Sequence, residues 1–309
     1  MTRGCSVAVG IAATLAVAVT GCGPGPGPGS TDVSVTVTRD FGAGQMRAIT
    51  EARVPGSETV IQLLERHFRI GARYGGDFVE SIDGRSGSSS HLDWFYYVNG
   101  VQAPQGAGTT AVHHGDRIWW DLHDWTATDS IPAVVGSFPE PFLDGVGGRR
   151  YPTTLECAPD ARQACAEADH ALVGLGIRVE RRSLRGGSGG GTIEIVVGTF
   201  GELTHVSAAR LVAGGPKSGG VYARFAGGGR RLLLLDPHDQ VARTLAAGAG
   251  LVAATAAGNG AVPTWVITGT DVAGVDAAAG ALSSGRLHDH FALAVEDGHS
   301  LPLPLDPTS

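Results

Sequence analysis

The sequence predicts an α+β protein in which an N-terminal β-grasp-like domain is followed by an α/β sandwich domain. Over residues 32–130, alternating strand patterns surround a single amphipathic helix pattern. Over residues 151–305, helix patterns alternate with apolar strand patterns, and a Pro- and Gly-rich connector at 131–150 separates the two regions. The chain has 309 residues and is 42% hydrophobic, which is enough for two domains with a core each.

Residues 1–22 have the organisation of a lipoprotein signal peptide. Arg3 is followed by an apolar run at 7–19, which is too short to cross a bilayer as a helix. The run ends at Val19-Thr20-Gly21-Cys22, which resembles the bacterial lipobox. The resemblance implies that Cys22 is diacylated and holds the protein on the extracytoplasmic side of the cell membrane. The alternative is an ordinary signal peptide with a cysteine nearby.

Residues 23–31 are dominated by Pro-Gly repeats, which predict an extended or flexible tether. The formal net charge is −7, and Lys217 is the only lysine. Because no block of basic residues occurs, nucleic acid is excluded as an expected partner. The expected partners are the membrane, reached through the lipid anchor, and a small ligand or an envelope protein.

The first domain divides into short elements separated by glycine-containing turns. We expect Ser57 to cap its helix, and Asn99-Gly100 to form a hairpin turn. Strands are predicted at 33–41, 47–55, 77–84 and 94–104 and in the closing segment 109–125, and the helix at 58–68.

Four motifs of this domain occur in a characteristic order: SETVIQLLERHF, GGDFVESIDG, WFYYVNG and HHGDRIWWDLHDW. Together they resemble the transcobalamin C-terminal-domain-like modules of bacterial surface proteins. The resemblance implies a β-grasp ligand-binding fold of largely unassigned function, with a cobalamin-like compound as the implied ligand. No other cofactor is expected.

Aromatic side chains project from both faces of the closing strand. Because strand residues alternate between faces, Ile118, Trp120 and Leu122 can fill the core. The opposite set either packs against the second domain or forms an exposed surface for a planar or amphipathic ligand. The ligand-binding hypothesis assigns that surface to Tyr97, Asn99, Trp119, Asp121, His123 and Trp125.

The same segment is rich in metal-ligand residue types, namely His113, His114, Asp121, His123 and Asp124. The adjacent histidines point in opposite directions on a strand, and no third ligand accompanies His123 and Asp121, so no metal site is predicted. Residues 114–116 are expected to form a turn.

Cys157 and Cys165 are expected to form a disulfide outside the cytoplasm. On one continuous helix they would lie about 12 Å apart, too far to bridge. Pro159 suits the first turn of a helix, which would leave Cys157 in the preceding loop and free to fold back.

The second domain has two glycine motifs that match enzyme signatures only by letter. Residues 186–190 match a nucleophile elbow but precede a strand, and residues 248–253 match a dinucleotide fingerprint but lie in an expected helix. Helices are predicted at 159–176, 202–214, 240–256 and 271–284, and strands at 177–184, 192–200, 220–226, 230–236, 263–270 and 290–296.

The sequence therefore favours a membrane-anchored extracytoplasmic lipoprotein that binds a small ligand or a surface partner. One alternative is an extracytoplasmic hydrolase or transferase, with Asp236, His238 and Asp271 as its acids and bases at a cleft of the second domain. No activated nucleophile accompanies these residues, so no catalytic residue is assigned. Another alternative is a structural subunit of an envelope complex.

Overall fold

The computed structural model describes residues 1, 29–87, 90–184 and 191–306. The predicted α+β class is confirmed: in the described part, 18 strands form four sheets together with seven helices. The signal peptide, Cys22 and most of the tether lie outside the described residues, as does the glycine motif at 186–190. Within the described part, no helix has both the length and the apolar character that a membrane span needs.

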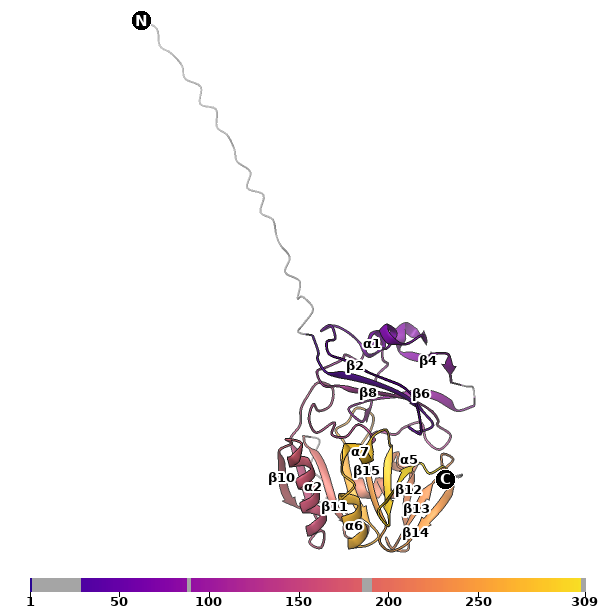
Figure 1. Ribbon diagram of the computed structural model, residues 1–309, viewed down its shortest axis with the longest axis vertical. Coiled ribbons are helices and arrows are strands. Elements are labelled where there is room, and N and C mark those ends of the chain that lie inside the picture. The colour runs from indigo at the N-terminus through magenta and orange to yellow at the C-terminus, as the bar shows by residue number, and fades with distance from the viewer. Residues whose placement is uncertain (2–28, 88–89, 185–190, 307–309) are drawn as a thin grey trace.

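The N-terminal domain is a five-stranded sheet covered on one face by a helix and a small second sheet (Figure 1). Its strand order is β2-β1-β8-β6-β7, with β1 parallel to β8 and the other pairs antiparallel. The strands are β1 Val33–Arg39, β2 Gly44–Glu51, β6 Leu92–Val98, β7 Val101–Gln102 and β8 Arg117–Asp124. The covering elements are α1 Val60–His67, the 3-10 helix η1 Tyr74–Gly76, and the sheet of β3 Ile70–Arg73, β4 Phe78–Ile82 and β5 Arg85–Ser86.

Helix α1 forms where the sequence has apolar residues at helical spacing. Its buried residues include Leu63 and Leu64, which pack over the sheet. The expected cap at Ser57 is wrong, because the helix begins two residues later with Thr59 as its N-cap. The Gln62 side chain accepts a hydrogen bond from the Thr59 backbone N–H at 3.0 Å, which satisfies a donor that the helix itself leaves open.

The second domain is built on a seven-stranded mixed sheet of order β10-β9-β11-β16-β15-β17-β18. The strands are β9 Thr153–Cys157, β10 Val179–Ser183, β11 Ile193–Thr199, β15 Gly250–Thr255, β16 Thr264–Gly269, β17 Ala292–Glu296 and β18 His299–Leu303. The helices are α2 Arg162–Gly174, α3 Phe200–Leu203, α4 Ser207–Ala213, α5 Pro216–Gly219, α6 Val272–Ala279 and α7 Ser284–Leu287. A separate antiparallel sheet contains β12 Ala223–Ala226, β13 Arg231–Leu235 and β14 Val241–Leu245.

Both faces of the large sheet are covered. Ile195, Trp265 and Ile267 point to one face, where α2 and α6 pack. Val196 and Val266 point to the other, where they share a core with residues of α4 and of the three-stranded sheet. The N-terminal domain lies on the side of the core that contains Val196 and Val266 (Figure 1). The connector at 131–150 contributes residues to the cores on both faces of the large sheet.

One predicted element of this domain is wrong and two strands were not predicted. The segment 240–256 is not a helix but contains β14 and β15. All six residues of β15 are buried, so both of its faces are apolar and the period-two pattern of a strand is lost. The unpredicted strands are β9, which is buried between β10 and β11, and β18 at the edge of the sheet.

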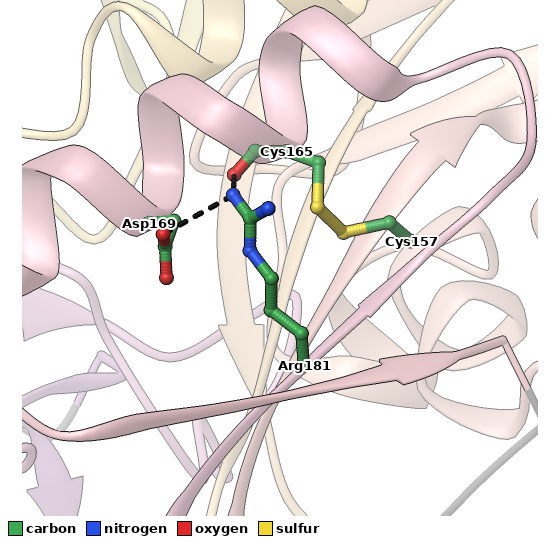
Figure 2. The surroundings of a disulfide bond; sticks show 4 residues. All are labelled: Cys157, Cys165, Asp169 and Arg181. Atoms are coloured by element: carbon green, nitrogen blue, oxygen red, sulfur yellow. Dashed lines mark hydrogen bonds and ion pairs between the residues drawn. A yellow bond between two sulfur atoms is a disulfide. The ribbon is translucent and has the colours of Figure 1, made fainter.

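The predicted disulfide is confirmed. Cys157 at the end of β9 is joined to Cys165 in the first turns of α2, with 6.1 Å between their Cα atoms (Figure 2). Arg181 on β10 donates to the Cys165 carbonyl oxygen and pairs with Asp169 at 3.1 Å (Figure 2). The bridge and this arginine fasten α2 to the edge of the sheet.

Candidate functional site

Strand β8 projects aromatic side chains from both of its faces, as predicted, and the second domain covers its outer face. Ile118, Trp120 and Leu122 fill the N-terminal core, as expected. Five residues of the predicted ligand surface are at most 3% exposed: Tyr97, Asn99, Trp119, Asp121 and His123. The prediction that these five are open to a ligand is wrong, and packing between the domains is what the structure has.

Phe291 of the second domain lies at the centre of this contact. Its ring meets the rings of Phe41, Tyr97, Trp119 and His123 edge-on, with centroid distances between 5.0 and 5.5 Å. Edge-on contacts of this kind are a favourable arrangement of aromatic rings. The cluster therefore joins the two domains through rings that they both supply.

A buried polar network fixes the orientation of these rings. Asp121 accepts hydrogen bonds from the backbone N–H groups of Phe41 and Gly42, at 3.0 and 2.9 Å. It also accepts from Thr38 Oγ1, which in turn accepts from Trp119 Nε1 at 2.7 Å, and it bonds His123 Nδ1 at 2.8 Å. The carboxylate is thus satisfied within the protein, as a buried charge requires.

Two glycines show how closely the domains approach. A Cβ atom on Gly136 would lie 2.7 Å from the Trp119 ring and 2.8 Å from the His290 nitrogen. A Cβ on Gly42, whose φ is +85°, would lie 1.8 Å from the Asp289 carbonyl oxygen. The contact between the two domains around Phe291, called the joint below, therefore leaves no room for a planar ligand beside Trp119.

Asn99 is a structural residue of the β6–β7 turn. Asn99 and Gly100 both have positive φ, as the predicted hairpin turn requires. The Asn99 side chain accepts from the Arg117 N–H and donates to Asp116 and to the Gly145 carbonyl oxygen of the connector. Its role is to tie the turn, β8 and the connector together.

Trp125 is the predicted ligand residue that is not buried in the joint. It is half-buried, directly after β8. Its Nε1 donates to Asp93 Oδ2 at 2.8 Å, and its ring meets His91 edge-on at 4.6 Å. These contacts hold the ring in one orientation at the surface.

The remaining candidates are held in turns and capping contacts. Asp236 accepts hydrogen bonds from the backbone N–H groups of His238 and Gln240 in an exposed turn. Asp271 caps α6 by accepting from Gly274 N, and it also accepts from Gly248 N. The structure assigns each carboxylate a structural contact and does not join them in one cleft. Within residues 29–87, 90–184 and 191–306, no group of three or more metal-ligand side chains is arranged to hold an ion.

An apolar cavity of about 270 Å³, the β7 cavity, opens where the N-terminal domain meets the connector. Most of its wall is apolar surface, and polar groups come from five side chains: Gln102, Gln105, Thr109, Thr110 and His113. Its lining is Val98, Val101–Gln105, Thr109–Ala111, His113, Val146, Gly147 and Gly260. Sequence reasoning missed this site, because apolar loop residues give no chemical signal and the connector joins them only in the fold.

Two titratable residues, one in the turn before β8 and one in the connector, have shifted pKa values, and the first of them lines the β7 cavity. A hydrogen bond to Asp116 raises the pKa of His113, and burial of the ring partly opposes this rise. Burial raises the pKa of Glu140 to about 7, and the neighbouring charges of Asp144 and Asp116 add to this. His113 is therefore the titratable residue in the cavity lining, whereas Glu140 is a buried residue of the connector.

A second cavity of about 230 Å³ shares the segment 102–105 with the β7 cavity and has several aromatic residues in its wall. One of them is Tyr96, whose hydroxyl bonds both the Gln105 carbonyl oxygen and Thr110 Oγ1. The Nε1 atom of Trp120, which lines the second cavity, is buried and has no hydrogen-bond partner among the described residues.

Comparison with known proteins gives a family match within the N-terminal domain. Residues 57–124 match the family model DUF4430, a domain of unknown function, and this range contains the four motifs that resemble transcobalamin C-terminal domains except for Trp125, the last residue of the fourth. A solved structure, described as that of a "putative metal binding protein" from Ruminococcus gnavus, is 19% identical. The match covers 31% of this chain and 98% of that one with a TM-score of 0.26. No curated protein matches the chain.

Proposed function

We propose that the protein is a lipid-anchored extracytoplasmic binding protein whose N-terminal domain takes a small amphipathic ligand in the β7 cavity. The observation that carries the proposal is the cavity itself, a mainly apolar hollow with five polar side chains, lined by the N-terminal domain, the connector and Gly260 of the second domain. Apolar pockets with a few converging polar groups are the usual form of small-molecule sites.

The size of the cavity limits the ligand. Its volume, about 270 Å³, is slightly below the common range for ligand pockets of roughly 300–1,000 Å³. It therefore accommodates a small molecule, or one group of a larger one such as the corrinoid that the transcobalamin resemblance implies. Gln102 and Thr109 would bond the polar edge of the ligand, and the aliphatic wall would bury its apolar part.

The test uses a variant that blocks the cavity from its rim. Ala111 is exposed and lines the cavity, so Ala111→Trp fills the opening without replacing a core residue. Ala48→Trp, on exposed β2 of the same domain, is the matched control. Calorimetric titration of residues 29–309 with cobalamin, with haem and with a panel of small amphipathic compounds should find a ligand that A48W binds and A111W does not. Binding to A111W at wild-type strength would place the ligand elsewhere, and no binding by any compound would count against the cavity as a site.

The anchor is tested separately in a bacterial host. Cys22→Ala should abolish incorporation of labelled palmitate and move the protein out of the membrane fraction, because Cys22 is the acceptor that the lipobox requires. Cys5→Ala is the control, since that cysteine precedes the cleavage site. Membrane retention of the C22A variant would refute lipid anchoring.

A further inference from the structure

A wide surface hollow of about 500 Å³ lies beside Trp125, separate from the β7 cavity. It is lined by Phe78, Glu80, Ser81, Ser86, Gly87, Asp93 and Trp125. Within the N-terminal domain these residues lie on β4, β5 and β6, except that Gly87 directly follows β5 and Trp125 directly follows β8. We propose that this Trp125 hollow is a binding site for a neutral glycan.

The first argument is the presence of two accessible aromatic rings. Phe78 is 43% exposed, and the ring of Trp125 is half-buried and fixed by Asp93 and His91. The faces of a sugar ring are covered by C–H groups with a small positive charge, which are attracted to the negative face of an aromatic ring. A tryptophan that is already fixed loses little conformational entropy when a sugar stacks on it.

The second argument is the hydrogen-bonding chemistry of the lining. Carboxylates accept hydrogen bonds from hydroxyl groups, and serine hydroxyls both donate and accept. Glu80, Asp93, Ser81 and Ser86 therefore provide a set of groups suited to a polyhydroxylated ligand. Among the described residues no lysine or arginine lines the hollow, and the nearby Arg73 is paired with Glu80, which disfavours phosphate, sulfate and other anions.

The third argument separates a neutral sugar from a cation. Glu80 is already paired with Arg73 at 2.7 Å, and Asp93 already accepts from Trp125 Nε1. Their negative charges are thus partly compensated, which weakens the attraction for an ammonium group while leaving lone pairs for hydroxyl donors. The hollow is also wide and shallow, as suits a few units of a longer chain that passes over the surface.

The proposal is independent of the β7 cavity, because Trp125 does not line that cavity. The experiment titrates residues 29–309 with cellohexaose, xylohexaose and N-acetylated chitohexaose at up to about 5 mM, a range that detects weak sites, and follows tryptophan emission and calorimetric heat. We expect at least one oligosaccharide to bind and to change the emission, since the other four tryptophans are each at most 7% exposed.

Three variants test the assignment. Trp125→Ala should weaken binding at least tenfold, and Trp125→Phe should retain part of it, because the stacking face remains. The variant A111W should bind the oligosaccharide as the wild type does, so that failure of the glycan site and failure of the β7 cavity give different results. No binding by any oligosaccharide, wild-type binding by a folded W125A, or binding of choline or spermidine in place of sugars would each overturn the proposal.

Discussion

Replacing Phe291 by alanine should separate the two domains energetically, because this ring is the contribution of the second domain to the centre of the joint. The side chain is 3% exposed and meets four rings of the N-terminal domain. Truncation of a buried phenylalanine costs about 3–5 kcal/mol, the sum of lost burial and a residual cavity. With its side chain buried among four rings, Phe291 should lie near the middle of this range, so we expect a loss of about 4 kcal/mol in the free energy of unfolding.

The measurement is urea unfolding of residues 29–309, followed by tryptophan emission and by far-UV circular dichroism. Phe78→Ala is the control, because Phe78 is exposed and its loss should change the free energy of unfolding by no more than about 0.5 kcal/mol. The wild type should unfold in one transition by both probes, and F291A should split it into two. A loss below about 1 kcal/mol, or quenching of Trp119 by acrylamide in the folded protein, would refute a packed joint.

Two further predictions concern stability. Replacing both Cys157 and Cys165 by alanine should lower the free energy of unfolding by about 2.5 kcal/mol, the chain-entropy value for a bridge of this short sequence separation, and urea unfolding with and without a reductant checks it. The pKa of Glu140 is raised from 4.5 to about 7 by burial, so between these pH values the folded state keeps a proton that the unfolded state loses. The free energy of unfolding should therefore fall as the pH rises from 4.5 to 7, by up to about 1.4 kcal/mol per pH unit, and the Glu140→Gln variant should lack this slope in urea titrations across that range.

The N-terminal domain could be predicted from sequence because its sheet has faces of different character. The alternation in β8 correctly divided Ile118, Trp120 and Leu122 from Trp119, Asp121 and His123. What covers the second set could not be predicted, since Phe291 is 168 positions beyond His123 in the chain and a single aromatic residue gives no sign of its partners. The local pattern was enough to predict to which face of β8 each side chain points. Whether that face contacts protein or solvent depends on long-range packing, which the pattern does not contain.

In the second domain, the local sequence pattern gave a wrong prediction for one segment. The segment 240–256 is rich in alanine, which favours a helix by intrinsic propensity. In the sheet, however, β15 lies between β16 and β17 with both faces covered, so small apolar residues fit on each side. A strand of this kind has no period-two pattern, and tertiary packing overrides the propensity. Strand β18 was not predicted because it contains Pro302, and proline in a sequence normally argues against a strand. The proline is tolerated here because β18 lies at the edge of the sheet.

The use of one aromatic face for the joint restricts where binding can occur. A ligand that reached Trp119 or His123 would first have to separate Phe291 from four rings and expose the buried Asp121 network, at a cost of several kcal/mol that its own binding would have to exceed. The β7 cavity and the Trp125 hollow require no such opening, because both already reach the surface. A binding function for this protein is therefore best sought at the rim of the N-terminal domain, where Trp125 and the segment 102–105 lie beside a joint that is already closed.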